Sequence, residues 1–240
     1  GLDVRLAAGA VLTESDLRAL NPQITEAEDG TLQADTSELL LSETYAIPQT
    51  EEILATVTVS GMPEPYQERQ YPLPAALPRE AAEVLALSYY NAEAGGQGFT
   101  CEPAGVGDYR QVVSSSRFAT FSEAEDYFET IYTPAVLSEL LQPLSDEGTG
   151  ESTAYYREGA GDTLLIMGYP YESIIPQSGY TFTEPQARPD GSLQFGGICV
   201  IVTDDLGEPL PEGAGRLYYS PTVLVETPDG WRVQQANPPF

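Results

Sequence analysis

Two amphipathic patterns follow one another between residues 122 and 144. The first places apolar residues at positions i, i+3, i+4 and i+7, namely Ala124, Tyr127, Phe128 and Ile131. Ser122 and Glu125 have the spacing of a capping box, which favours a helix beginning at Ser122. Pro134 suits the first turn of a second helix, whose apolar stripe contains Leu137, Leu140, Leu141 and Leu144. The pattern predicts helices over Ser122–Ile131 and Pro134–Leu144.

A third helix is predicted just after Pro78. Proline is favoured in the first turn of a helix, and the pair Gly95-Gly96 ends the pattern. The apolar face of this helix is expected to contain Ala81, Ala82, Leu85, Tyr89 and Ala92.

From Ser152 onward the hydrophobic period changes to two, which is typical of strands. Strands are predicted at Thr153–Arg157, Thr163–Met167, Tyr180–Thr183, Leu193–Thr203, Leu217–Tyr219, Thr222–Thr227 and Trp231–Gln235. Pro-Asp-Gly occurs at 189–191 and at 228–230, each time between strand-like runs. This tripeptide favours tight hairpins, because proline sets φ at one corner and glycine accepts a positive φ at another. Helices followed by antiparallel strands predict an α+β fold, with the helices packed on a mainly antiparallel sheet.

The first third of the chain has a different organisation. Ile53–Val59 is β-branched and alternating, which predicts a strand. The segment from Met62 to Pro78 inclusive then contains five prolines, a density that disfavours helices and inner strands and favours an extended spacer. We therefore expect a small N-terminal module or docked extension at 1–62, a proline-rich linker at 63–77 and a main α+β domain at 78–240.

Charge restricts the partners. The net charge at pH 7 is −27, and every basic residue is an arginine. Such a surface is expected to repel nucleic acids and anionic lipids, which leaves cations, basic proteins and uncharged ligands as partners. No run approaches the roughly 18 apolar residues of a transmembrane segment. The bland alternative is that the charge only keeps the surface solvated.

The missing residue types restrict the chemistry. The chain has no histidine and no lysine. Histidine-assisted nucleophiles, histidine-bound zinc, Schiff bases and phosphate-binding loops are therefore excluded. Carboxylate chemistry, arginine or tyrosine electrophiles and a bare thiol remain. No cofactor is expected.

Residues 108–240 carry a resemblance to a known family. Its features are Tyr127, Tyr132 and Thr133 around the first helix, a hairpin around Gly159–Gly161, and the closing run Gly230–Val233. This order resembles the NTF2-like and cystatin-like domains of secreted proteins from Gram-positive bacteria, especially the family of the IseA cell-wall DL-endopeptidase inhibitor. The resemblance implies a curved sheet backed by helices and non-catalytic binding to a hydrolase. It supplies no catalytic residue.

Aromatic residues in the strand-rich half are the first candidate binding residues. If they line the concave face of a curved sheet, they would form a ligand groove or a protein-binding hot spot. The candidates are Tyr155, Tyr169, Tyr171, Tyr180, Tyr218 and Trp231. The alternative is ordinary core and cross-strand packing, because strands are commonly rich in aromatic residues.

Acidic residues supply a weaker metal candidate. Asp204, Asp205 and Glu208 follow a predicted strand and offer oxygen ligands of the type Ca²⁺ prefers, although their spacing is not that of an EF-hand. The alternative is a solvated loop. A glycosidase would need two carboxyls held at a defined separation across a cleft, which sequence spacing does not measure.

Cys101 and Cys199 are candidates for a single disulfide in an oxidising compartment. Cys101 follows a glycine-rich stretch, and Cys199 lies within an apolar run that predicts a buried strand. The alternative is two separate buried thiols.

These observations support three hypotheses for function. The first is a non-catalytic extracytoplasmic module, secreted or anchored at the cell surface, that binds a protein or cell-wall component and inhibits or regulates envelope hydrolases. The second is a carboxylate-based glycan hydrolase, and the third is a surface scaffold domain without a small ligand. The N-terminus, Gly1–Val4, lacks the basic and apolar regions of a signal peptide, so any export signal is expected either to have been removed or never to have existed. The oligomeric state is left open.

Overall fold

The computed structural model describes residues 51–144, 154–168, 177–201, 208 and 215–236, together with short strands nearer the N-terminus. Side chains are described for 51–144, 154–168, 182–197, 208 and 221–236. The short strands are β1 (Ala7–Ala8), β2 (Ile24–Glu26), β3 (Leu32–Ala34), β4 (Glu38–Leu39) and β5 (Pro48–Gln49). Among the described residues no helix has the length and apolar character needed to cross a membrane.

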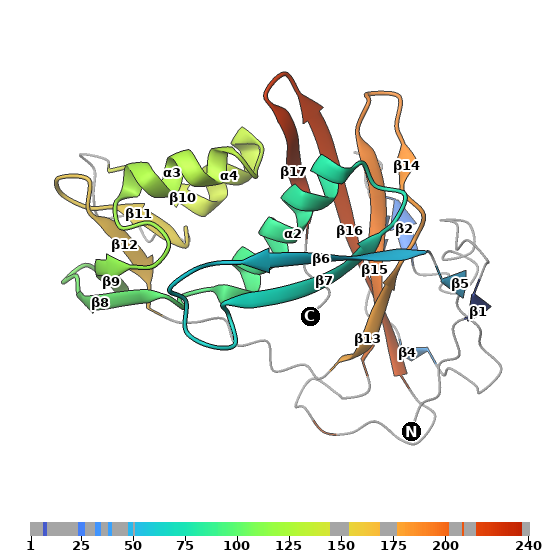
Figure 1. Cartoon of the computed structure of the whole chain (residues 1–240), viewed down its shortest axis with the longest axis horizontal. Helices are drawn as coiled ribbons and strands as arrows, with labels where there is room; N and C mark the ends of the chain where they lie inside the picture. Colours follow the sequence, from blue (N-terminus) through green and yellow to red (C-terminus); the bar gives the residue numbers. More distant parts are fainter. Residues whose placement is uncertain are drawn as a thin grey trace.

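The fold is α+β, with two larger sheets and a separate hairpin (Figure 1). The five-stranded sheet has the order β10-β11-β12-β9-β8. Its strands are β8 (Phe99–Pro103), β9 (Tyr109–Ser115), β10 (Leu141–Gln142), β11 (Tyr156–Glu158) and β12 (Leu164–Met167). All neighbours in it are antiparallel except β10 and β11.

The six-stranded sheet has the antiparallel path β13-β15-β16-β17, to which β14 and β4 are added. Its main strands are β13 (Gln177–Phe182), β14 (Gln186–Ala187), β15 (Leu193–Ile201), β16 (Gly215–Thr227) and β17 (Gly230–Ala236). The two Pro-Asp-Gly segments connect β14 to β15 and β16 to β17, as predicted. Gly191 and Gly230 adopt φ values of 86° and 107°, which explains why glycine ends each turn.

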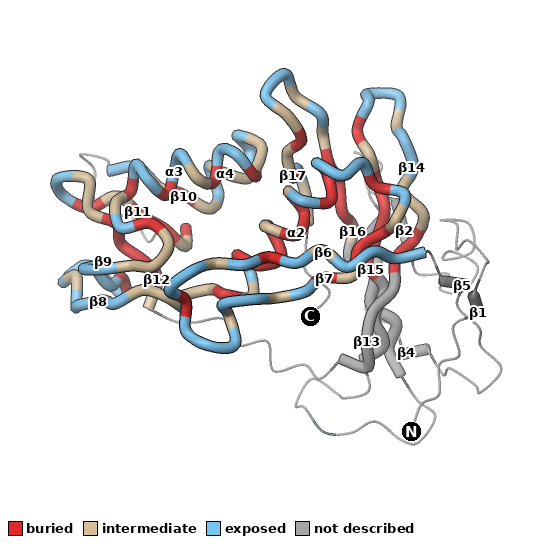
Figure 2. Tube along the Cα trace, viewed as in Figure 1, coloured by how far each residue is buried: buried red, intermediate tan, exposed pale blue. Residues whose placement is uncertain are grey.

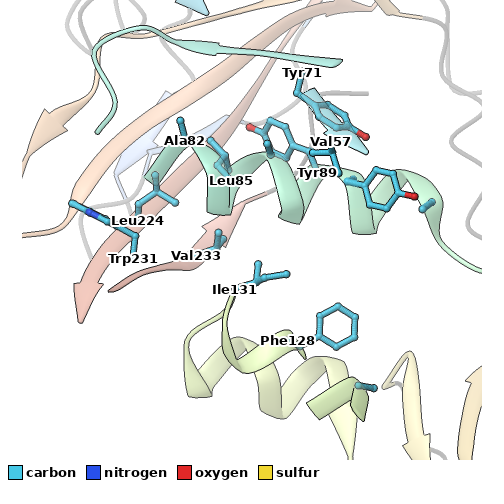
Figure 3. Packing of buried hydrophobic residues seen from close by; sticks show 14 of the residues in the cluster. Val57, Tyr71, Ala82, Leu85, Tyr89, Phe128, Ile131, Leu224, Trp231 and Val233 are labelled. Atoms are coloured by element: carbon cyan, nitrogen blue, oxygen red, sulfur yellow. The ribbon is translucent and has the colours of Figure 1, made fainter. Parts of the chain in front are cut away.

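Helix α2 (Arg79–Ala94) lies at the centre of the core. It contacts β17 on one side and the hairpin of β6 (Glu52–Thr58) and β7 (Glu68–Pro74) on the other. Figure 3 shows Leu85 and Tyr89 of α2 between Leu224 and Val233 of the six-stranded sheet and Tyr71 of the hairpin. Figure 2 shows that buried residues gather in the middle of the molecule, whereas the residues of β6 are mostly exposed.

Helices α3 (Phe121–Glu129) and α4 (Pro134–Leu140) cover the five-stranded sheet and reach the six-stranded one. Their connection forms a bridge to β17: the Thr133 N–H donates to the Val233 carbonyl at 3.0 Å, and the Val233 N–H donates to the Ile131 carbonyl at 2.7 Å. Ile131 is fully buried beside this bridge. The two sheets are thus joined through a single apolar core.

The predicted helices are confirmed with corrections at their ends, and α3 ends at Glu129 rather than at Ile131. The capping box of α3 consists of Thr120 and Glu123, not Ser122 and Glu125, so the helix begins at Phe121, which is buried. Helix α4 ends at Leu140, since Leu141 has an extended backbone and pairs in β10. On α2, Ala92 is exposed, while Ala86 and Tyr90 join the buried face instead.

The predicted single sheet is divided in the structure. Strands β11 and β12 pair with β8 and β9, two strands that the sequence pattern did not predict, whereas the strands from β13 onward form their own sheet. The proposed curved, NTF2-like form of the sheet is not established by this arrangement. The structure also differs from the expectation of a linker at 63–77. Its prolines are compatible with the extended strand β7, and Tyr71, Leu73 and Leu77 are buried in the shared core.

Candidate functional site

Two of the candidate aromatic residues have described side chains, and both contribute to the core. Trp231 is 9% exposed and belongs to the central apolar cluster. Tyr155 is half-buried, with its ring 4.8 Å from that of Tyr156, and burial raises the pKa of its hydroxyl. Of the other candidates, Tyr169 and Tyr171 lie outside the described residues, and Tyr180 and Tyr218 lie on β13 and β16 with side chains outside them.

Tyr155 belongs to an aromatic cluster arranged around Arg117. The guanidinium carbon of Arg117 lies 5.3 Å from the ring centre of Phe99 and 5.0 Å from that of Phe118. Its nitrogens donate hydrogen bonds to the Gly95 carbonyl at 3.0 Å and to the side-chain oxygen of Asn91. These contacts tie the end of α2 to the five-stranded sheet, so the cluster has a structural explanation and needs no ligand.

The metal and disulfide candidates gain no support from the described residues. Asp204 and Asp205 lie outside them, and Glu208 is exposed. Within the described part of the chain no group of three or more cysteines and carboxylates is arranged to hold a metal ion. Cys101 is a free thiol on β8, in a different sheet from Cys199 on β15, whose side chain is not described. The predicted bridge is therefore not formed in this structure.

The strongest candidate site is a groove between β6 and α2. It has a volume of about 560 Å³, and its lining is mainly apolar. The lining residues are Ile53, Ala55, Thr56, Val57, Thr58, Leu77, Arg79, Ala82, Glu83, Ala86 and Leu87. We call this the β6–α2 groove. Such a volume lies within the range of roughly 300–1,000 Å³ that is usual for ligand sites.

Small residues explain why a groove exists here. Ala55 faces α2 from the strand, and Ala82 and Ala86 face it from the helix, one turn apart. Methyl side chains at facing positions leave the space that larger residues would fill. Ile53 lines one end of the groove and is 40% exposed. The β6–α2 groove is therefore an apolar surface that none of the described residues covers.

The β6–α2 groove runs along the edge of β6, not only over its face. Ala55, Thr56, Val57 and Thr58 are consecutive, and all line it. Because consecutive side chains of a strand point to opposite faces, a groove that contacts all four residues must include the strand's backbone edge. Among the strands of the structure, β6 pairs only with β7, so its other edge carries no strand partner.

Register determines which backbone groups face that edge. The Ala75 N–H donates to the Glu51 carbonyl at 2.8 Å, and the Val59 N–H donates to the Gln67 carbonyl at 2.9 Å. These odd-numbered residues of the β6 segment are thus the hydrogen-bonded positions of the antiparallel ladder. At the even-numbered positions Leu54, Thr56 and Thr58, the N–H and C=O groups point away from β7, toward the open edge.

The charged residues of the groove neutralise each other. Arg79 Nε donates to Glu83 Oε1 at 2.8 Å, in an exposed pair one helical turn apart. On the outer face of the hairpin, Glu52 and Glu68 are exposed acids. Since Leu54, Thr56, Thr58, Gln70 and the prolines of β7 complete that face, it carries no basic residue.

A second groove, of about 590 Å³, lies between α4, the β14–β15 turn and β17. Both Glu139 and Asp190 line it, which makes it the nearest match to a carboxylate pair across a cleft. However, hydrogen bonds from the Ser192 hydroxyl and N–H lower the pKa of Asp190. A general acid needs a raised pKa, so the lowered pKa of Asp190 disfavours this carboxyl in that role.

Sequence reasoning missed the β6–α2 groove. The available signal was in the strand Ile53–Val59, where Ile53 and Leu54 are adjacent apolar residues, one of which must leave the buried face. Leu54 is 67% exposed. The other wall comes from a helix that begins more than twenty residues later, and its proximity is a result of folding.

Comparison with known proteins adds no relative. No protein-family model matches the chain, no curated protein matches it, and no solved structure matches it. These comparisons do not bear on the resemblance to the IseA inhibitor family.

Proposed function

We propose that this protein is a non-catalytic binding module that holds a segment of a partner protein in the β6–α2 groove. The observation that carries the proposal is an apolar groove along an edge of β6 that pairs with none of the described strands. An exposed apolar groove and an open strand edge both favour association, because a protein partner can cover the apolar surface and pair with the edge. Ile53 and Leu54 are the apolar contact residues at this edge.

The composition supports binding over catalysis. The chain lacks histidine and lysine, so most nucleophilic and acid–base chemistry has no residue to perform it. In the described residues, the carboxyls whose pKa shifts are Asp162 and Asp190, and both shift downward. Each of them accepts hydrogen bonds from neighbouring serine groups, which is the arrangement of a helix cap or a turn.

We further propose that the partner is an envelope hydrolase and that the protein acts outside the cytoplasm as its inhibitor or regulator. This part rests on the resemblance of residues 108–240 to the IseA inhibitor family. A strongly acidic surface also suits a partner with a basic face, because opposite charges accelerate association.

A matched pair of variants tests the proposal. Ile53→Glu places a charge in the groove, whereas Val113→Glu makes the same change at another exposed strand position, on β9. Immobilised wild-type protein is expected to retain a hydrolase from a Gram-positive envelope extract and to inhibit its peptidoglycan cleavage. Ile53→Glu should lose both effects, and Val113→Glu should keep both. Equal retention and inhibition by the two variants would exclude the groove as the binding site.

A further inference from the structure

We propose that the second groove, between α4, the β14–β15 turn and β17, is a binding site for neutral saccharides. We call it the α4–β17 groove. Its volume of about 590 Å³ lies within the range of roughly 300–1,000 Å³ that is usual for ligand sites. It shares no described lining residue with the β6–α2 groove, so the saccharide and the partner protein have separate sites.

A β-bulge in β17 directs two neighbouring glutamines into the α4–β17 groove. Val223 of β16 lies opposite Gln235, whereas Leu224 lies opposite Val233, so Gln234 is an extra residue in β17. Consecutive residues of a regular strand point to opposite faces, but a bulge changes the direction of one of them. Gln234 and Gln235 therefore both line the groove. Neither side chain forms a hydrogen bond with any residue that the structure describes, so both amides are free to donate and to accept.

A buried glutamine holds Arg188 at the same groove. Gln194 is 3% exposed, and its Oε1 accepts a hydrogen bond from Nη1 of Arg188. Gln194 lies opposite Val223, which lies opposite Gln235, so its side chain is on the face of the sheet that carries the groove. Gln194 Nε2 has no hydrogen-bond partner among the described residues. A buried donor without an acceptor is costly, so this amide points to an acceptor that a ligand supplies from the groove.

The charged residues of the groove disfavour an anionic ligand. Hydrogen bonds from Ser192, and then the positive charge of Arg188, lower the pKa of Asp190, so Arg188 and Asp190 offset each other. Glu139 on α4 is exposed and forms no ion pair within the described part of the chain. One carboxylate thus remains uncompensated, in a chain whose net charge is −27.

Hydroxyl groups match this lining. Each hydroxyl both donates and accepts, so a saccharide can pair with amide, guanidinium and carboxylate groups at once. Ala135, Val136 and Val223 provide small apolar patches for the C–H groups of a sugar ring. Among the described lining residues none is aromatic and valine is the largest aliphatic side chain, which gives the large apolar anchors of a peptide little to pack against.

Calorimetric titration of the full chain with neutral tetrasaccharides tests the proposal. Cellotetraose, maltotetraose and chitotetraose are the probes, and tetragalacturonate is the anionic control. We expect at least one neutral probe to bind with a Kd of about 1 mM or lower and with little dependence on salt. Absence of binding by all three neutral probes, or tighter binding of tetragalacturonate, would overturn the proposal.

Glutamine substitutions locate the site. Replacing both bulge amides, in Gln234→Ala combined with Gln235→Ala, should weaken binding of the neutral probe roughly tenfold or more. Gln111→Ala removes an exposed amide from β9, in the other sheet, and should leave binding unchanged. Equal binding by the double variant and by Gln111→Ala would overturn the α4–β17 groove as the site.

Gln194→Glu tests the buried amide. This change keeps an acceptor for Arg188 and removes the unpaired donor, so we expect binding to weaken roughly tenfold without loss of the folded state. Unchanged affinity in the folded variant would overturn the role of Gln194. If the variant does not fold, Arg188→Met removes the groove's guanidinium donors, and unchanged binding there would overturn the proposal.

Two further results separate this inference from the proposed function. Ile53→Glu, which places a charge in the β6–α2 groove, should leave saccharide binding unchanged even if it abolishes binding of the partner protein. Loss of saccharide binding in Ile53→Glu would overturn the separate site. Shorter saccharides detected by mass spectrometry after incubation with the protein would overturn binding without catalysis.

Discussion

The Tyr71 hydroxyl donates a 2.6 Å hydrogen bond to Oε2 of Glu93, the same carboxylate that pairs with Arg69. Tyr71 and Arg69 lie on β7, and Glu93 lies in the last turn of α2. The interaction therefore fastens the hairpin to the helix that forms the other wall of the β6–α2 groove. Burial raises the pKa of Tyr71, so its hydroxyl remains a donor at any ordinary pH.

Removing this hydroxyl should loosen the groove wall. We expect Tyr71→Phe to reduce the free energy of unfolding by about 1–2 kcal/mol, because a hydrogen bond to a charged carboxylate is lost. Urea denaturation at pH 7 measures the effect as a lower midpoint with an unchanged slope. Arg79→Ala, which removes the exposed pair with Glu83, should leave the midpoint unchanged. Identical midpoints for Tyr71→Phe and wild type would contradict the assigned role.

A pair of truncations tests whether the hairpin belongs to the main domain. A chain beginning at Glu51 keeps β6 and β7, whereas one beginning at Pro78 loses Tyr71 and Leu73 from the core. Each large buried side chain contributes about 1.5–3 kcal/mol, against a typical domain stability of roughly 5–15 kcal/mol. We expect the longer chain to unfold cooperatively in calorimetry and the shorter one to show no transition. A native-like transition in the chain from Pro78 would instead support the boundary predicted from the sequence.

The start of α3 is held by a residue from a distant turn. Asp162 adopts a φ of 63° and accepts hydrogen bonds from the Ser122 N–H at 2.8 Å and the Ser122 hydroxyl at 2.9 Å. Both hydrogen bonds lower the pKa of Asp162, and the bond from the Ser122 N–H has the larger effect. Asn tolerates positive φ and keeps the acceptor oxygen, so Asp162→Asn should lower the melting temperature less than Asp162→Ala.

The pH dependence of this cap has a definite sign. A carboxyl with a lowered folded pKa stabilises the fold above its unfolded pKa, near 4, and loses that contribution as pH falls through the folded value. The difference in melting temperature between wild type and Asp162→Ala should therefore shrink below about pH 4. A difference that stays constant from pH 6 to pH 3 would show that the charge of Asp162 is not involved.

Tyrosines should control the stability of the protein in alkali. Burial raises the pKa of Tyr132 to about 12 and also raises that of the fully buried Tyr156. Unfolding lets these hydroxyls ionise near their ordinary pKa of about 10, so stability is complete below that pH and falls as pH rises above it. Because the chain has no lysine, no amine side chain titrates in this range to obscure the effect.

Absorbance at 295 nm measures this titration directly. Exposed tyrosines should ionise near pH 10, and the buried ones only as the protein unfolds at higher pH. Tyr132→Phe should flatten the loss of stability above pH 10, because one fewer hydroxyl ionises on unfolding. A single titration near pH 10 with no change in the unfolding temperature would contradict the burial of these hydroxyls.

The sequence by itself determined the local elements and much of the excluded chemistry. The helices around Phe128 and Leu137, the strand at Ile53–Val59 and the two Pro-Asp-Gly turns follow from apolar periodicity and turn preferences between neighbours in the chain. The absence of histidine and lysine likewise needs no coordinates. These features depend on residues a few positions apart, so a linear pattern is sufficient to find them.

Only the tertiary structure decided which strands share a sheet and where a binding surface remains. Strands β8 and β9 carry no strong alternating pattern, and their pairing with β12 depends on contacts between distant residues. The proline content of residues 63–77 predicted a spacer, because proline indicates a backbone preference. It carries no information about the burial of Tyr71 in the core. Ala55 and Ala86 form one groove although 31 positions separate them in the sequence. The groove depends on a helix packed beside β6 and on an edge of β6 that no described strand covers, and neither property is encoded in a local pattern.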